Sequence, residues 1–370
     1  MRATLILSAI VLIASMPGGR GTAWAEPGSR KLEVLSKTYT IDRKYRSMEG
    51  PESTQQLTLL ATETPELLWI RGYRAVMVGP DGQTRMPQEF MCHSNLDFLD
   101  VSKHNELFKA RKSLTSRLFT LSQGQFDIEF PKGFGIPVRS DEPFSLTTQV
   151  LNLNLEHPDA QVRHQVTIDF VRDQDLEAPL QPLFSSGAYG LELLEGQDGY
   201  FGVPQPKAEA HGPGCLVGTN ASSHTYKDPA GKTFTGHWVV KPGREVNKTL
   251  VTHLMNLPFD TTIHYIAVHL HPFAESIALR DLTTGQTLYT SQATNFSDRI
   301  GLERVDAYSS PAGIPVFQNH EYELVSIYNN TTSENQDSMA VMYVYLEDRE
   351  FLHPFRAQSV DMSQAQRPQL

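Results

Sequence analysis

Apolar and polar residues alternate along this chain in short runs that are separated by turn residues. Alternation with a period of two is typical of β-strands with one buried face. The runs predict strands at residues 66–70, 73–78, 144–153, 163–171 and 322–328. Residues 80–82 and 284–286 have the composition of hairpin turns, and a short helix is predicted only at 105–113. The pattern therefore predicts an all-β protein made of antiparallel β-sandwich, jelly-roll-like domains.

The first 25 residues have the pattern of a cleaved signal peptide. Arg2 precedes an apolar stretch from Leu5 to Met16, and the segment ends in Ala-Trp-Ala at 23–25. No later stretch approaches the roughly 20 apolar residues that a membrane-spanning helix needs. We therefore expect a secreted or periplasmic protein that does not insert into a membrane.

Length and charge limit the domain number and the partners. About 345 residues remain after residue 25, which is more than one hydrophobic core usually organises. A Gly/Pro-rich stretch with little pattern separates two strand-rich halves, so we expect an N-terminal domain at 26–192, a linker or inserted loop at 193–236 and a C-terminal domain at 237–370. The net charge of −10 argues against nucleic acid as a partner.

The two cysteines, Cys92 and Cys215, leave two alternatives open. In an oxidising compartment they could form one disulfide between distant parts of the chain. Alternatively, Cys92 is a metal ligand or a free thiol, because it stands directly beside His93.

The residue pattern most indicative of function is the pair His269 and His271 in a predicted strand. Residues two apart in a strand project from one face, so these imidazoles become neighbours. Neutral imidazole is a preferred ligand of copper and zinc. Met339 opens a later apolar strand, where its thioether, a soft ligand that favours copper, could reach the same ion. The alternatives are solvated histidines and a methionine that only fills the core, as we expect for Met342 on the opposite face.

These segments resemble a known family. Residues 263–274 and 278–289, which contain the His pair and a following hairpin, together with 332–345 around Met339, are similar to the C-terminal domain of the type II copper, ascorbate-dependent monooxygenases, which include peptidylglycine α-hydroxylating monooxygenase and dopamine β-hydroxylase. Residues 240–245 and 180–189 extend the similarity upstream. The resemblance implies that His269, His271 and Met339 are the ligands of an oxygen-binding copper.

The N-terminal half departs from the family pattern. Members hold a second, electron-supplying copper there with an adjacent His-His pair and a third histidine. The local matches place Cys92 and His93 at the pair, and Leu151 at the third position. The second copper is therefore either absent or rebuilt from Cys92, His93 and another histidine. The remaining candidates are expected to be surface or structural histidines: His104, His157, His164, His211, His224 and His237.

Two classes of function follow from this sequence. The first is a copper-dependent monooxygenase with one copper ion, or two, that uses O2 and an external reductant such as ascorbate to hydroxylate a C–H bond of a small-molecule or peptide substrate. In it, Tyr265 and Glu275 could orient the imidazoles, although Glu275 also fits a solvated hairpin position. The second is a non-catalytic copper-binding protein for storage, delivery or sensing. Zinc is a weaker alternative, because zinc sites rarely accept a thioether.

Overall fold

The computed structural model of the chain describes residues 28–45, 47, 49–108, 115–193, 225–228, 230–349, 351 and 353. The predicted signal peptide, Cys215, His211 and His224 lie outside these residues. Within the described residues, no helix is long and apolar enough to cross a membrane.

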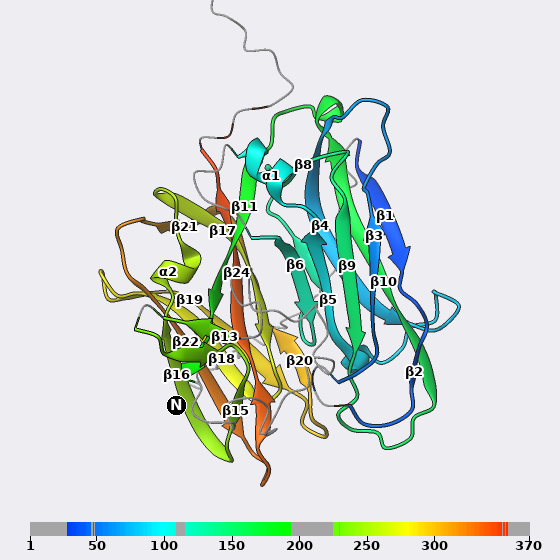
Figure 1. Cartoon of the computed structure of the whole chain (residues 1–370), viewed down its shortest axis with the longest axis vertical. Coiled ribbons are helices and arrows are strands. Elements are labelled where there is room, and N and C mark those ends of the chain that lie inside the picture. The colour runs from blue at the N-terminus through cyan, green and yellow to red at the C-terminus, as the bar shows by residue number, and fades with distance from the viewer. Residues whose placement is uncertain are drawn as a thin grey trace, which may run out of the picture.

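Strands make up most of the described chain (Figure 1). The N-terminal half contains β1 (Arg30–Leu35), β2 (Tyr39–Ile41), β3 (Glu52–Leu57), β4 (Leu67–Val78), β5 (Met91–Phe98), β6 (Arg117–Ser122), β7 (Asp127–Glu129), β8 (Phe134–Arg139), β9 (Phe144–Val150), β10 (Ala160–Arg172) and β11 (Gln181–Tyr189). The later strands are β12 (Glu192–Leu193), β13 (Thr225–Lys227), β14 (Thr233–Thr235), β15 (Trp238–Val240), β16 (Gly243–Leu250), β17 (Thr261–Leu270), β18 (Ala274–Asp281), β19 (Gln286–Asn295), β20 (Leu302–Val305), β21 (Tyr308–Val316), β22 (Tyr322–Asn330), β23 (Gln336–Ser338) and β24 (Ala340–Glu347). The helices are short: α1 (Ser102–Leu107), α2 (Thr252–Met255) and the 3-10 turns η1 (Gln88–Phe90) and η2 (Asp173–Asp175).

The predicted strands are confirmed, with shifts that have local causes. The runs at 66–70 and 73–78 form one strand, β4, because the register against β10 shifts between Ile70 and Gly72, so that Arg71 forms a bulge. The predicted strand at 144–153 ends at Val150. The predicted helix begins earlier than expected, at Ser102. The backbone N–H of Ser102 donates to the Asp100 carboxylate at 2.9 Å. Both hairpin turns are present, and Gly285 supplies the positive φ of +73° in the second.

Three large sheets build an all-β sandwich architecture. A ten-stranded sheet follows the path β1-β10-β4-β8-β11-β24-β17-β21, and it faces a four-stranded sheet (β3-β9-β5-β6) in the N-terminal half and a five-stranded sheet (β16-β22-β18-β19-β20) in the C-terminal half. The two halves meet in the long sheet through β8 and β11, which pair in parallel. The described ends of the 193–236 segment form a small sheet, β12-β14-β13. The domain boundaries themselves stay a prediction.

Strands β17 and β24 lie between two hydrophobic cores. Tyr265 and Ala267 of β17 belong to the core shared with the N-terminal strands, whereas Ile266 and Val268 belong to the C-terminal core. Because side chains alternate along a strand, the face that carries Tyr265 also carries His269, and it points toward the N-terminal half. The fold therefore places the predicted ligands where the two halves meet.

The buried carboxyl of Glu142 should make the free energy of unfolding depend on pH. Burial raises the pKa of Glu142 from 4.5 to about 7, and its Oε2 accepts a hydrogen bond from the Arg139 backbone N–H at 2.7 Å. The folded state thus binds this proton more tightly than the unfolded state, so stability is lost as pH rises from about 4.5 to 7, by roughly 3 kcal/mol.

We expect Glu142→Gln to reduce the difference in the free energy of unfolding between pH 5 and pH 8. Urea titrations at the two pH values measure this difference, and Glu321→Gln, at an exposed position, is the control. An unchanged difference in Glu142→Gln would contradict the assignment.

Candidate metal site

The pairing of β17 with β24 places both predicted imidazoles and Met339 on one face of the sheet. His269 pairs with Val341 and Leu270 with Ala340, where the pairing of the two strands ends. The same register, continued by one residue, would place Met339 opposite His271 and on the face of His269. The Tyr328 hydroxyl links the two residues: it donates to the Met339 carbonyl at 2.5 Å and accepts from the backbone N–H of His271 at 3.4 Å. The predicted shared face of His269 and His271 is thus confirmed, with ring centroids 5.3 Å apart.

All three side chains are buried, with exposed fractions of 4% for His269, 5% for His271 and 4% for Met339. Met339 belongs to the core on this face, whereas Met342 belongs to the core on the opposite face, as predicted. A metal ion held here would be shielded from bulk water.

His269 has no hydrogen-bond partner for either ring nitrogen among the described residues. Its burial, together with the nearby His271, lowers its pKa well below the ordinary value of 6.5. The ring is therefore neutral at neutral pH, the form that binds metals. An unpaired buried donor and acceptor cost free energy, and a metal ligand bond would offset that cost at one nitrogen.

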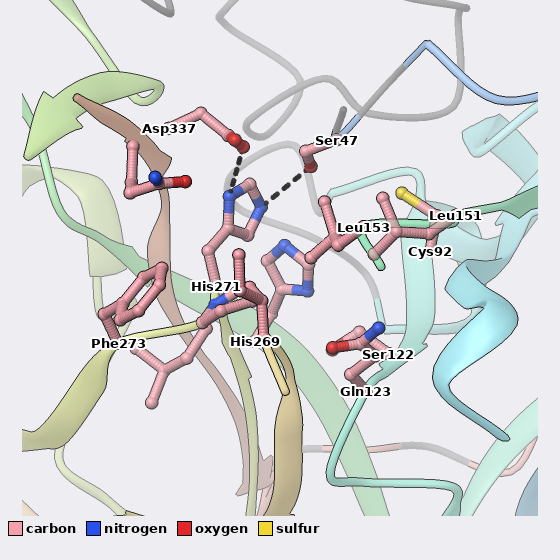
Figure 2. A pocket seen from close by; sticks show the side chains of 14 residues that line it. Ser47, Cys92, Ser122, Gln123, Leu151, Leu153, His269, His271, Phe273 and Asp337 are labelled. Atoms are coloured by element: carbon pink, nitrogen blue, oxygen red, sulfur yellow. Dashed lines mark hydrogen bonds and ion pairs between the residues drawn. The ribbon is translucent and has the colours of Figure 1, made fainter. Parts of the chain in front are cut away.

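His271 has a polar neighbour at each ring nitrogen (Figure 2). Its Nδ1 lies 2.8 Å from the Asp337 carboxylate on β23, close enough for an ion pair but without the angles of a hydrogen bond. Its Nε2 lies 3.5 Å from the Ser47 hydroxyl. Imidazoles that bind metals commonly donate their other N–H to a carboxylate. Sequence reasoning did not single out Asp337 as a neighbour of His271, and Ser47 carried no signal because it is 224 residues from His271.

A third imidazole, His237, is fully buried beside the pair, with its ring centroid 5.8 Å from that of His271. His237 directly precedes β15, which pairs with β23, the strand of Asp337. Sequence reasoning treated His237 as a surface or structural histidine. Only the pairing of β15 with β23 brings it to the site.

One pocket opens onto the site between the two halves. His269, His271 and Asp337 line it from the C-terminal half, and Ser47 and Cys92 line it from the N-terminal half (Figure 2). The remaining lining is mixed apolar and polar: Ser122, Gln123, Leu151, Leu153, Leu270, Pro272, Phe273, Ile300 and Gln336.

The weaker candidates, Cys92 and His93, are neighbours on β5, but only Cys92 lines this pocket. Burial, with a smaller contribution from Arg117, lowers the pKa of His93 to about 3, and neither ring nitrogen of His93 has a hydrogen-bond partner among the described residues. Leu151, at the position of the expected third histidine, is one of the pocket's apolar residues. The disulfide between Cys92 and Cys215 stays a prediction, because Cys215 lies outside the described residues.

Within the described residues, no group of three or more His, Cys, Asp or Glu side chains is placed to hold a metal ion. A second metal site in the N-terminal half thus has no set of such side chains already arranged for it. Of His269, His271 and Met339, only the two histidines belong to these four residue types. The third ligand of the predicted site would be the Met339 thioether.

The other histidines of the N-terminal half and the predicted orienting residues lie in other environments. His104 is a core residue that stacks on Phe98 at 4.1 Å, His164 is buried, and His157 is exposed. Glu275 forms a surface ion pair with Arg244 at 2.8 Å, which agrees with a solvated hairpin position.

Comparisons with known proteins do not assign the chain to a family. No family model matches it, and no curated protein matches it. Among solved structures, the chain is similar to a peptide-N(4)-(N-acetyl-β-D-glucosaminyl) asparagine amidase (8% identity, 86% of this chain and 96% of that chain, TM-score 0.35). It is also similar to PBCV-1 VP54 (9% identity, 88% and 96%, TM-score 0.32) and to the STIV MCP (9% identity, 85% and 98%, TM-score 0.29). The fold and site define an all-β sandwich protein with a buried His-His-Met face.

Proposed function

We propose that this protein is a secreted or periplasmic copper-dependent monooxygenase that binds one copper ion through His269, His271 and Met339. The observation that carries the proposal is the shared buried face of β17 and β24, which holds two adjacent imidazoles beside a pocket and, on the neighbouring strand, a buried thioether. Imidazole suits copper in general, and a thioether selects Cu(I).

The surroundings of the three side chains support a redox role. The two imidazoles and the thioether leave room in the coordination sphere of a copper ion, which would supply one-electron chemistry and activate O2 when bound. The pocket lies between the halves beside His269 and His271, so a small-molecule or peptide substrate would have to reach the site from there. Electrons would come from an external reductant such as ascorbate, since the N-terminal half lacks an arranged set of His, Cys, Asp or Glu ligands among its described residues.

A second candidate function is copper binding without catalysis, for storage, delivery or sensing. The specific observation in its favour is Leu151, a buried apolar residue at the position where the family resemblance requires a copper ligand. Loss of the electron-supplying copper would remove the family's route for reduction while the C-terminal site remained.

Metal analysis followed by oxygen uptake tests the proposal. We expect the purified chain, loaded with Cu(I) and washed with a chelator, to retain one copper per chain, and to consume O2 with ascorbate in a substrate-dependent way. The control is the protein with both His269 and His271 replaced by Ala. Retained copper without substrate-dependent uptake over a broad panel would favour the second function, whereas preferential retention of zinc would contradict both.

A further inference from the structure

The two polar neighbours of His271 differ in what they can donate. An ionised carboxylate offers only acceptors, whereas a hydroxyl donates or accepts. With Asp337 Oδ2 at 2.8 Å from Nδ1, a lone pair on Nδ1 would lie close to a negative oxygen, which is repulsive, whereas an N–H there would be attracted to it. A neutral His271 ring therefore carries its proton on Nδ1, and its lone pair is on Nε2.

The Nε2 lone pair then accepts from the Ser47 hydroxyl. The distance of 3.5 Å makes this a weak contact, longer than the 2.6–3.2 Å typical of a serine nucleophile and its base. A weak neighbour is easily displaced. His269, by contrast, has no partner to displace within the described residues.

We propose that Asp337 is a positioning residue that makes Nε2 the metal-binding nitrogen of His271, and that the Ser47 hydroxyl occupies this nitrogen until the metal arrives. The inference rests on the proposed function. A carboxylate behind a ligand imidazole fixes its orientation and raises its basicity, so Asp337 strengthens the metal bond, whereas Ser47 competes with it.

The protonation state of the ring is measured first, on the metal-free full chain. With 15N-labelled histidine, NMR should show His271 with its proton on Nδ1. Asp337→Ala should shift the proton partly or fully to Nε2, whereas Asp337→Asn, which keeps an acceptor oxygen, should shift it less. Asp281→Ala is the matched control, because it removes another Asp–His pair of the C-terminal half, in which the buried Asp281 lies 2.7 Å from the half-buried His320.

Copper affinity is measured next, by competition with a Cu(I) chelator. We expect Asp337→Ala to weaken binding by about 10- to 100-fold and Asp281→Ala to leave it unchanged. Ser47→Ala should bind copper as tightly as the wild type or more tightly. Thermal unfolding of each variant separates a loss of fold from a loss of affinity.

Three results would overturn the proposal. They are a wild-type His271 with its proton on Nε2, equal copper affinity in Asp337→Ala and the wild type, and covalent labelling of Ser47 by a fluorophosphonate, which would make the Ser47, His271 and Asp337 set a nucleophilic one. If the wild type binds no copper, the proposed function and the role of Ser47 both fail. The ring proton alone then decides whether Asp337 positions His271.

Discussion

Replacing His269 with Leu is expected to abolish copper binding and, at the same time, to stabilise the metal-free protein. The ring is buried, and neither nitrogen has a hydrogen-bond partner among the described residues. Each buried polar group left unpaired costs about 1 to 3 kcal/mol, and leucine has a similar size without polar atoms. A gain of about 1 kcal/mol or more in the free energy of unfolding is therefore expected in the absence of metal.

Urea unfolding of the metal-free protein measures the first effect, and copper retention against a chelator measures the second. His104→Leu is the matched control, since His104 is also buried but stacks on Phe98 and meets Phe108 edge-on. It should retain copper like the wild type. Undiminished copper retention by His269→Leu would remove His269 from the ligand set.

Replacing Met339 with Leu is expected to lower Cu(I) affinity by more than about tenfold, because loss of a group behind a ligand already costs 10- to 100-fold. Cu(II) binding should change less, since imidazole suits both oxidation states. Substrate-dependent O2 uptake should be lost with the Cu(I) affinity.

Met342→Leu is the control within the same strand. Met342 is buried like Met339 but lies in the core on the other face of β24. Exchange of Met for Leu conserves volume and usually costs less than about 1.5 kcal/mol, so both variants should fold. Equal losses of Cu(I) affinity in the two variants would mean that Met339 acts by packing alone.

Most strands could be predicted from the sequence because the alternation of buried and exposed side chains along a strand is a local property. The run that became β22 and the run that became β10 each bury every second side chain, so their pattern survives in any sheet. The single strand β4 was split in the prediction, since the bulge at Arg71 interrupts the alternation without ending the pairing. The start of the helix was displaced because Asp100, outside the apolar pattern, accepts the backbone N–H of Ser102, the first residue of α1.

The sequence by itself determined that His269 and His271 share a face and that Met339 and Met342 do not, because a period of two is fixed by the backbone of a strand. Only the tertiary structure decided what surrounds those faces. Asp337 reaches His271 because its strand, β23, directly precedes β24, which pairs with β17. Ser47 and Cys92 reach the pocket because the N-terminal half packs against β17 and β24. Such neighbours come from pairings between distant segments, which no local pattern encodes.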